Sequence, residues 1–119
     1  MNIIVEKSKS FALNIIEVYK WLCKNKHEFI LSKQLLRSGT GIGANIKEAI
    51  RGQSKADFYA KLFISLKEAS EAEYWLELLH ESEYLPTTLF TDIYAECQEI
   101  LKILTAIVKH RQYVVPTRL

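Results

Sequence analysis

Glu77 and His80 are the residues whose types and spacing come closest to a metal site. They form a Glu-x-x-His motif, which places both side chains on one face of a helix, as in the di-iron sites of helical bundles. Such sites need this motif on two helices and a further carboxylate on each of two others. Neither His27 nor His110 has a glutamate three residues before it. We therefore expect an exposed His80, and no bound metal or cofactor.

A glycine-rich segment, SGTGIGAN at residues 38–45, could be taken for a phosphate-binding loop. A dinucleotide-binding loop follows a strand, and a P-loop ends in Gly-Lys-Ser/Thr; here a helical pattern precedes the glycines instead. Glycine inside a helix costs about 1 kcal/mol relative to alanine, so we expect a neighbouring helix to pack closely here. A break, with the helix restarting near Ile42, is the alternative. The predicted close-packing residues are Gly39, Gly41, Gly43 and Ala44.

The remaining residues suggest no catalytic site. No Ser/His/Asp or Cys/His set can be nominated, and each of the three histidines falls near a predicted helix end, where a general base is hard to place. We expect a protein that is not an enzyme and has no small-molecule substrate.

Composition favours one helical domain in a reducing compartment. The chain has 119 residues, 49% of them hydrophobic, with only four glycines and two prolines to form turns. Glu6 and Lys7 interrupt the apolar N-terminus, so no signal peptide is expected, and no apolar run reaches the ~20 residues that span a membrane. Cys23 and Cys97 are isolated, which is typical of reduced thiols. These features predict a cytoplasmic protein without membrane contact.

Apolar residues at three- and four-residue steps predict four helices. The first runs from about Ile4 to Cys23 and the second from Phe29 to Arg51. Ser54 and Asp57 resemble a capping box that opens the third helix, which fades after His80. The fourth starts at Thr87 or Thr88 and reaches Arg111, and residues 112–119 form a tail. The expected fold is all-α, an antiparallel up-down-up-down four-helix bundle that forms a single domain over residues 1–119.

Aromatic residues surround the third helix on more than one face, and a single bundle seam cannot bury all of them. Aromatic side chains are enriched in subunit interfaces, which makes this helix a candidate for contact with another copy of the chain. Base stacking beside lysines is the alternative. The predicted oligomer-interface residues are Tyr59, Phe63, Tyr74 and Trp75.

Charge is divided unevenly along the chain. Residues 1–67 carry twelve Lys and Arg against five Asp and Glu, a balance of +7, and residues 68–119 carry four against nine, a balance of −5; together they give the net charge of +2. Such a split can bring two unlike surfaces together or attract a polyanion, although solvated helix faces would show it too. Possible inter-helix ion pairs involve Arg37, Glu48, Arg51, Lys67, Glu68 and Glu71.

Nucleic acid is the alternative partner that the basic half suggests. Phosphate contacts from lysine and arginine would make such binding depend strongly on salt. The candidate contacts are Lys24, Lys26, Lys47, Arg51, Lys55, Lys61, Lys109, Arg111 and Arg118.

Three stretches carry a resemblance to a known family. They are LRSGTGIGANIKEAI at residues 36–50, SKADF at 54–58 and LKEASEAEYWL at 66–76. Together they resemble the small bacterial four-helix bundle family that is also named for proteins encoded in 23S rRNA intervening sequences. The likeness covers nearly the whole chain.

This resemblance implies an antiparallel bundle that forms a ring-shaped homo-oligomer, with five subunits as the expected number. A related protein, the accessory protein of diversity-generating retroelements, is a basic pentameric barrel associated with nucleic acid and reverse transcriptase. The family offers no catalytic residues to transfer, and its name describes gene location. A ring needs two different faces of each subunit to meet, which fits the uneven charge.

Overall fold

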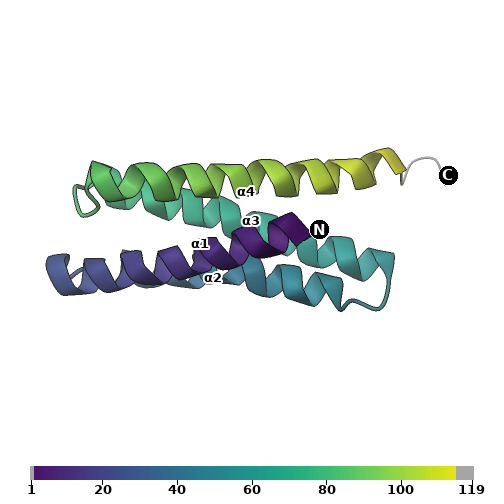
Figure 1. Cartoon of the computed structure of the whole chain (residues 1–119), viewed down its shortest axis with the longest axis horizontal. Coiled ribbons are helices and arrows are strands. Elements are labelled where there is room, and N and C mark those ends of the chain that lie inside the picture. Colours follow the sequence, from purple (N-terminus) through teal and green to yellow (C-terminus); the bar gives the residue numbers. More distant parts are fainter. Residues whose placement is uncertain (1, 115–119) are drawn as a thin grey trace.

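Four helices follow one another in the part of the chain that the computed structural model describes, residues 2–114, with side chains for residues 3–110 (Figure 1). They are α1 (Asn2–Trp21), α2 (Leu31–Ile50), α3 (Lys55–Glu81) and α4 (Thr87–Val114), and one π-helical turn, η1 (Leu22–Lys26), extends α1. The helices alternate in direction and form a rod with extents of 54 × 23 × 22 Å. The predicted all-α, up-down-up-down bundle is confirmed.

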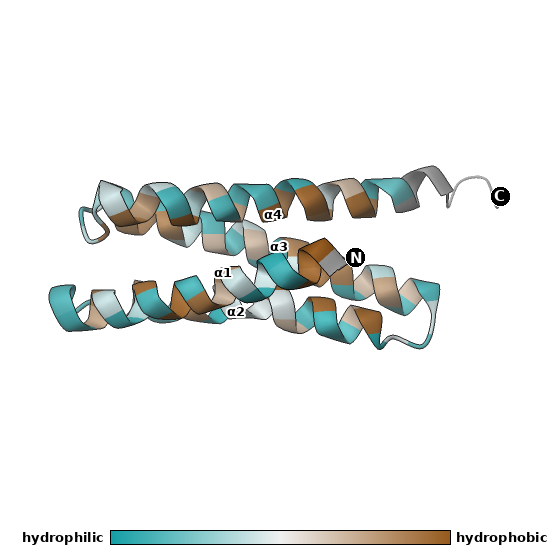
Figure 2. Ribbon diagram, in the orientation of Figure 1, coloured by the Kyte–Doolittle hydropathy of each residue, from teal (hydrophilic) through white to brown (hydrophobic). Residues whose placement is uncertain are grey.

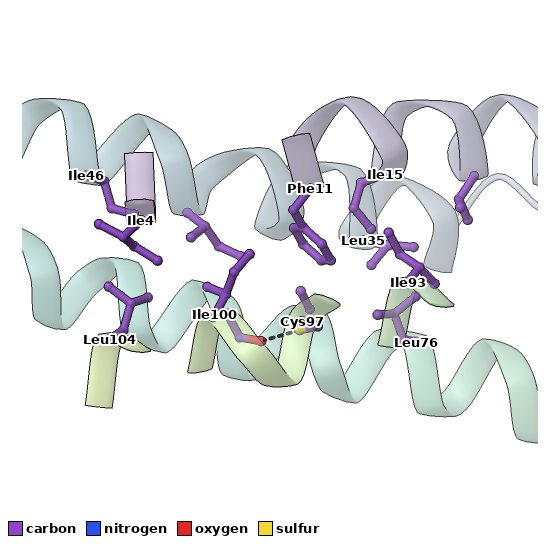
Figure 3. Packing of buried hydrophobic residues seen from close by; sticks show 14 of the residues in the cluster. Ile4, Phe11, Ile15, Leu35, Ile46, Leu76, Ile93, Cys97, Ile100 and Leu104 are labelled. Atoms are coloured by element: carbon purple, nitrogen blue, oxygen red, sulfur yellow. Dashed lines mark hydrogen bonds between the residues drawn. The ribbon is translucent and has the colours of Figure 1, made fainter. Parts of the chain in front are cut away.

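Each helix packs on the helix next to it in the sequence, and α4 closes the bundle against α1. Apolar residues at the predicted three- and four-residue steps point inward; Figure 2 shows the hydrophobic side of α4 turned towards the other helices. Phe11, Leu35, Leu76 and Ile93 meet in the interior, one from each helix (Figure 3). None of the helices in residues 2–114 has the length and apolar character needed to cross a membrane.

Four buried serines lie among these apolar residues: Ser8, Ser32, Ser38 and Ser65. Apolar periodicity gives no sign of them, because serine counts as polar in such a pattern. Their hydroxyl groups donate to backbone carbonyls, which removes the cost of burying them. Ser65 Oγ bridges two helices, since it donates to the Ile42 carbonyl of α2 over 2.8 Å.

Glu28 caps the N-terminus of α2, a role that sequence reasoning missed. After η1, His27 adopts a left-handed conformation with φ of 52°, which reverses the chain. The buried Glu28 carboxylate then accepts the backbone N–H groups of Ile30, Leu31 and Ser32 over 3.1, 2.9 and 2.7 Å. Burial alone would raise the pKa of Glu28, but these backbone donors outweigh it, and the net pKa lies below its ordinary value.

The glycine-rich segment does not break α2, which is helical from Leu31 to Ile50, and none of its glycines has a positive φ. The capping residue of α3 is the predicted one, since the Asp57 N–H donates to Ser54 Oγ over 3.1 Å.

The fourth helix is longer than predicted. It continues to Val114 instead of ending at Arg111. Pro116 lacks a backbone N–H and disfavours helix in the residue before it, so it leaves residues 112–114 free to remain helical. The rest of the expected tail, residues 115–119, lies outside the described residues.

Candidate interaction surfaces

Three glycines of α2 lie where neighbouring helices come close. A Cβ atom on Gly39 would lie 2.9 Å from both Cγ1 and Cγ2 of Ile15 in α1. A Cβ atom on Gly41 would lie 2.5 Å from Glu68 Oε2 of α3. A Cβ atom on Gly43 would lie 3.3 Å from Ser8 Oγ of α1. Ala44 was expected in the same contact but is exposed, because it lies on the outward side of α2.

Alanine substitutions at two of these glycines should have opposite effects. Ile15 is fully buried and cannot move away, so overpacking outweighs the gain in helix propensity, and Gly39→Ala should lower the free energy of unfolding by about 1 kcal/mol. Gly41 faces the flexible end of a glutamate side chain, so Gly41→Ala should raise it by up to about 1 kcal/mol. Urea denaturation at one protein concentration measures both. Equal effects of the two variants would contradict the packing argument.

The solvent side of α3 carries a stripe of residues at alternating steps of four and three. We call it the outer stripe of α3; its members are Ala60, Ile64, Lys67, Glu71, Tyr74, Leu78 and Glu81. Ile64 and Tyr74 are 41% and 55% exposed. An alternation of four and three is the spacing by which one helix packs along another, yet all of these residues except Leu78 are exposed, so no helix among residues 2–114 covers this side.

The four aromatic residues predicted for the interface do not lie together on this side. Tyr74 is exposed, and its ring lies 5.4 Å from that of Trp75. Phe63 and Trp75 are half-buried and pack partly on the core. Tyr59 is only 7% exposed and belongs to the core of the chain itself, because its position on α3 faces the other helices. Tyr59 therefore offers almost no surface to a second subunit, contrary to its predicted place in an interface.

The predicted ion pairs are largely replaced by others. Glu48 pairs with Lys61 across α2 and α3 over 2.8 Å, a partner absent from the predicted set. Burial, followed by the charge of Glu71, raises the pKa of Glu68 above its ordinary value. The nearby cations Arg37 and Lys67 act in the opposite direction but more weakly. Lys7 pairs with Glu99 over 3.0 Å and joins α1 to α4. Arg51 lines a surface cavity. Among residues 3–110 it has no ion-pair partner within salt-bridge distance.

Four of the predicted nucleic-acid contacts gather where α2 passes into α3. Lys47, Arg51 and Lys61 line a cavity of about 400 Å³, together with Glu48 and Asp57, and Lys55 is exposed in the first turn of α3. Lys109 lies at the same end of the bundle, on the last turns of α4 (Figure 1).

The other predicted contacts lie elsewhere. Lys24 and Lys26 are in η1 at the opposite end, where the Lys26 ammonium lies 6.0 Å from the centre of the Trp21 ring. The side chain of Arg111 and the whole of Arg118 lie outside the described residues.

The Glu-x-x-His motif joins α3 to α4. The Tyr94 hydroxyl donates to the Glu77 carboxylate. This bond, together with burial and the charges of Glu73 and Glu77, raises the pKa of Tyr94 to about 12. His80 stacks on Phe90 with ring centres 4.0 Å apart, and its Nε2 lies 3.1 Å from Thr87 Oγ1. His80 was expected to be exposed and is half-buried. No three His, Cys, Asp or Glu side chains among residues 3–110 are grouped as metal ligands would be.

Both cysteines are free. Burial, followed by the nearby carboxylates of Glu73 and Glu77, raises the pKa of Cys97 to about 12. Cys97 therefore remains a neutral thiol, which donates to the Ala69 carbonyl over 3.4 Å (Figure 3).

Bundle topology, the glycine-rich α2 and the aromatic α3 define a small four-helix bundle protein. The sequence matches the 23S rRNA-intervening sequence protein family over residues 1–106, and the chain belongs to that family. The resemblance found in the sequence is thereby confirmed.

A solved structure agrees with this assignment. It is the crystal structure of a protein of unknown function from the S23 ribosomal protein family of Bacteroides thetaiotaomicron, which is 51% identical to this chain and matches with a TM-score of 0.87. The match covers 89% of this chain and 98% of the other. A comparison with curated proteins gives no match.

Proposed function

We propose that this protein assembles with copies of itself through the outer stripe of α3 and serves as a non-enzymatic scaffold or adaptor in the cytoplasm. The exposed apolar side chains on the side of α3 away from the core carry this proposal. A helix with apolar residues on all sides is normally buried on all sides, and the core of this bundle covers only one side of α3. A second subunit on this side would remove Ile64 and Tyr74 from water.

Family membership and charge support a closed ring. Five subunits is the number that the family resemblance implies. A ring of five uses two different faces of each subunit, so that every face finds a partner. The basic α1 and α2 and the acidic second half of α3 supply two such faces. The free cysteines support a reducing compartment.

Disrupting the outer stripe should release single subunits. Light scattering should give a mass several times 13.8 kDa for the wild type, and 13.8 kDa for the double variant Ile64→Glu/Tyr74→Glu, because burying two carboxylates in an apolar contact is costly. The control Ile30→Glu changes a residue that is 76% exposed outside the stripe and should keep the wild-type mass. Unchanged circular dichroism would show that the variant is still folded. A wild type of 13.8 kDa would disprove the proposal.

Binding of nucleic acid is the second candidate function, because Lys47, Arg51 and Lys61 line one cavity at the α2–α3 end and Lys55 is exposed at the start of α3. Fluorescence anisotropy with a labelled single-stranded RNA should show binding that weakens steeply with salt. The triple variant Lys47→Ala/Arg51→Ala/Lys55→Ala should lose more affinity than Lys24→Ala/Lys26→Ala at the other end. No binding at low salt would exclude this function.

A further inference from the structure

A groove runs between α1 and α2 on the outside of the bundle. It has a volume of about 260 Å³, and its lining residues are Val5, Ser8, Ala12, Thr40, Gly43 and Ala44, with Lys9 and Lys47 at the edges. Its walls are largely small or apolar side chains. The groove exists because Gly43 lets α1 approach α2 closely, with Ser8 as the neighbour across the contact, and because small side chains do not fill the space above that contact.

The edge of the groove on α2 is strongly basic. Residues of α2 and its C-terminal end at alternating steps of four and three form what we call the outer stripe of α2. Its members are Lys33, Arg37, Thr40, Ala44, Lys47 and Arg51. This outer stripe of α2 includes four cationic side chains and no carboxylate. Thr40 and Ala44 in its middle are the residues that line the groove.

The second half of α3 has the opposite charge. Residues 68–81 include five glutamates and no lysine or arginine; the glutamates are Glu68, Glu71, Glu73, Glu77 and Glu81. Glu71 and Glu81 belong to the outer stripe of α3, on either side of Tyr74 and Leu78. This part of α3 therefore presents an apolar ridge between carboxylates, while the groove presents an apolar floor between cations.

We infer that the groove between α1 and α2 receives the outer stripe of α3 from a second copy of the chain. This inference rests on the proposed self-association and specifies its geometry. Tyr74 and Leu78 lie over Ala44 and Gly43, and Glu71 meets Lys47, the cation of the outer stripe of α2 that also lines the groove. Ridges of one helix fit grooves between side chains of another at this spacing. Because the two surfaces differ, each subunit binds one neighbour through α3 and another through its groove.

Two variants that each block one surface test this arrangement. The groove variant is Ala44→Trp, which fills the groove at an exposed position, and the stripe variant is Ile64→Glu/Tyr74→Glu. Each alone should have a mass of 13.8 kDa. Mixed in equal amounts, they should form a complex of two subunits, since one intact groove and one intact stripe remain. The control Ala106→Trp adds the same side chain to an exposed alanine of α4 and should keep the wild-type mass.

The possible results separate this inference from the function on which it rests. A wild type of 13.8 kDa disproves self-association itself. An oligomeric wild type with an oligomeric Ala44→Trp variant overturns the groove alone, because α3 would then bind another surface. Two single-subunit variants that do not combine on mixing also overturn it.

Charge reversal tests the same contact without placing a large side chain in the groove. Lys47→Glu and Glu71→Lys should each weaken association about two- to fivefold, as expected of an exposed ion pair. The two substitutions in one chain should restore the wild-type affinity. Additive losses in the double variant would contradict the predicted contact between Lys47 and Glu71.

Discussion

Phe11→Ala should lower the free energy of unfolding by about 3–5 kcal/mol, the range for removing a large aromatic side chain from a packed core. Phe11 has no exposed surface and lies near Ile15, Leu35 and Cys97 in the centre of the bundle (Figure 3). Alanine would leave a cavity that the surrounding rigid helices can fill only in part. A domain of this size has a total stability of about 5–15 kcal/mol, so this one change removes a large share of it.

Urea denaturation monitored by circular dichroism measures the effect, at one protein concentration because assembly would add to apparent stability. Phe29→Ala is the matched control, since the Phe29 side chain is 54% exposed and should change stability by less than about 0.5 kcal/mol. A loss below 1 kcal/mol for Phe11→Ala would show that the core is not packed around this ring.

Glu28→Gln should destabilise the protein by about 1–3 kcal/mol at pH 7. Glutamine keeps the shape of the side chain but loses the negative charge that accepts three backbone N–H groups at the N-terminus of α2. Hydrogen bonds to a charged group contribute about 1.5–3 kcal/mol, and the helix dipole adds to the effect. An amide NH₂ group would also face backbone donors that it cannot satisfy.

Acid should remove this difference. The pKa of Glu28 is lower in the folded chain than in the unfolded one, so its contribution is complete above the unfolded value of about 4.3 and is lost as pH falls through the folded pKa. The wild type and Glu28→Gln should therefore become equally stable in acid. Glu17→Gln, which removes an exposed i,i+3 pair with Lys20, should cost little at any pH. A pH-independent gap for Glu28→Gln would contradict the capping role.

The helices and most of the core could be predicted from the sequence, because apolar spacing and caps are local signals. Phe11, Leu35, Leu76 and Ile93 follow the three- and four-residue steps and are all buried. Ser54 precedes α3 as a typical capping residue. Helix direction followed from the short connections, since neighbouring helices joined by few residues must run antiparallel.

The details of the surfaces could not be predicted, because they depend on how each helix is rotated. Tyr59 and Tyr74 are the same residue type on the same helix, yet one is buried and the other is exposed. Glu28 was missed because glutamate is not among the usual capping residues, and its role needs the chain reversal at His27. The Glu48–Lys61 pair likewise depends on the relative position of α2 and α3.

Packing between successive helices also determines how the chain reaches this structure. The contacts between α1 and α2, α2 and α3, and α3 and α4 join neighbours in the sequence, and among the described helices the main contact between distant segments is that of α1 with α4. Chains with mostly local contacts fold quickly, and a single domain generally folds as one unit. The four helices of one subunit should thus form together, and quickly. Each subunit should therefore be complete before it associates, so that the rate of assembly depends on protein concentration and not on folding.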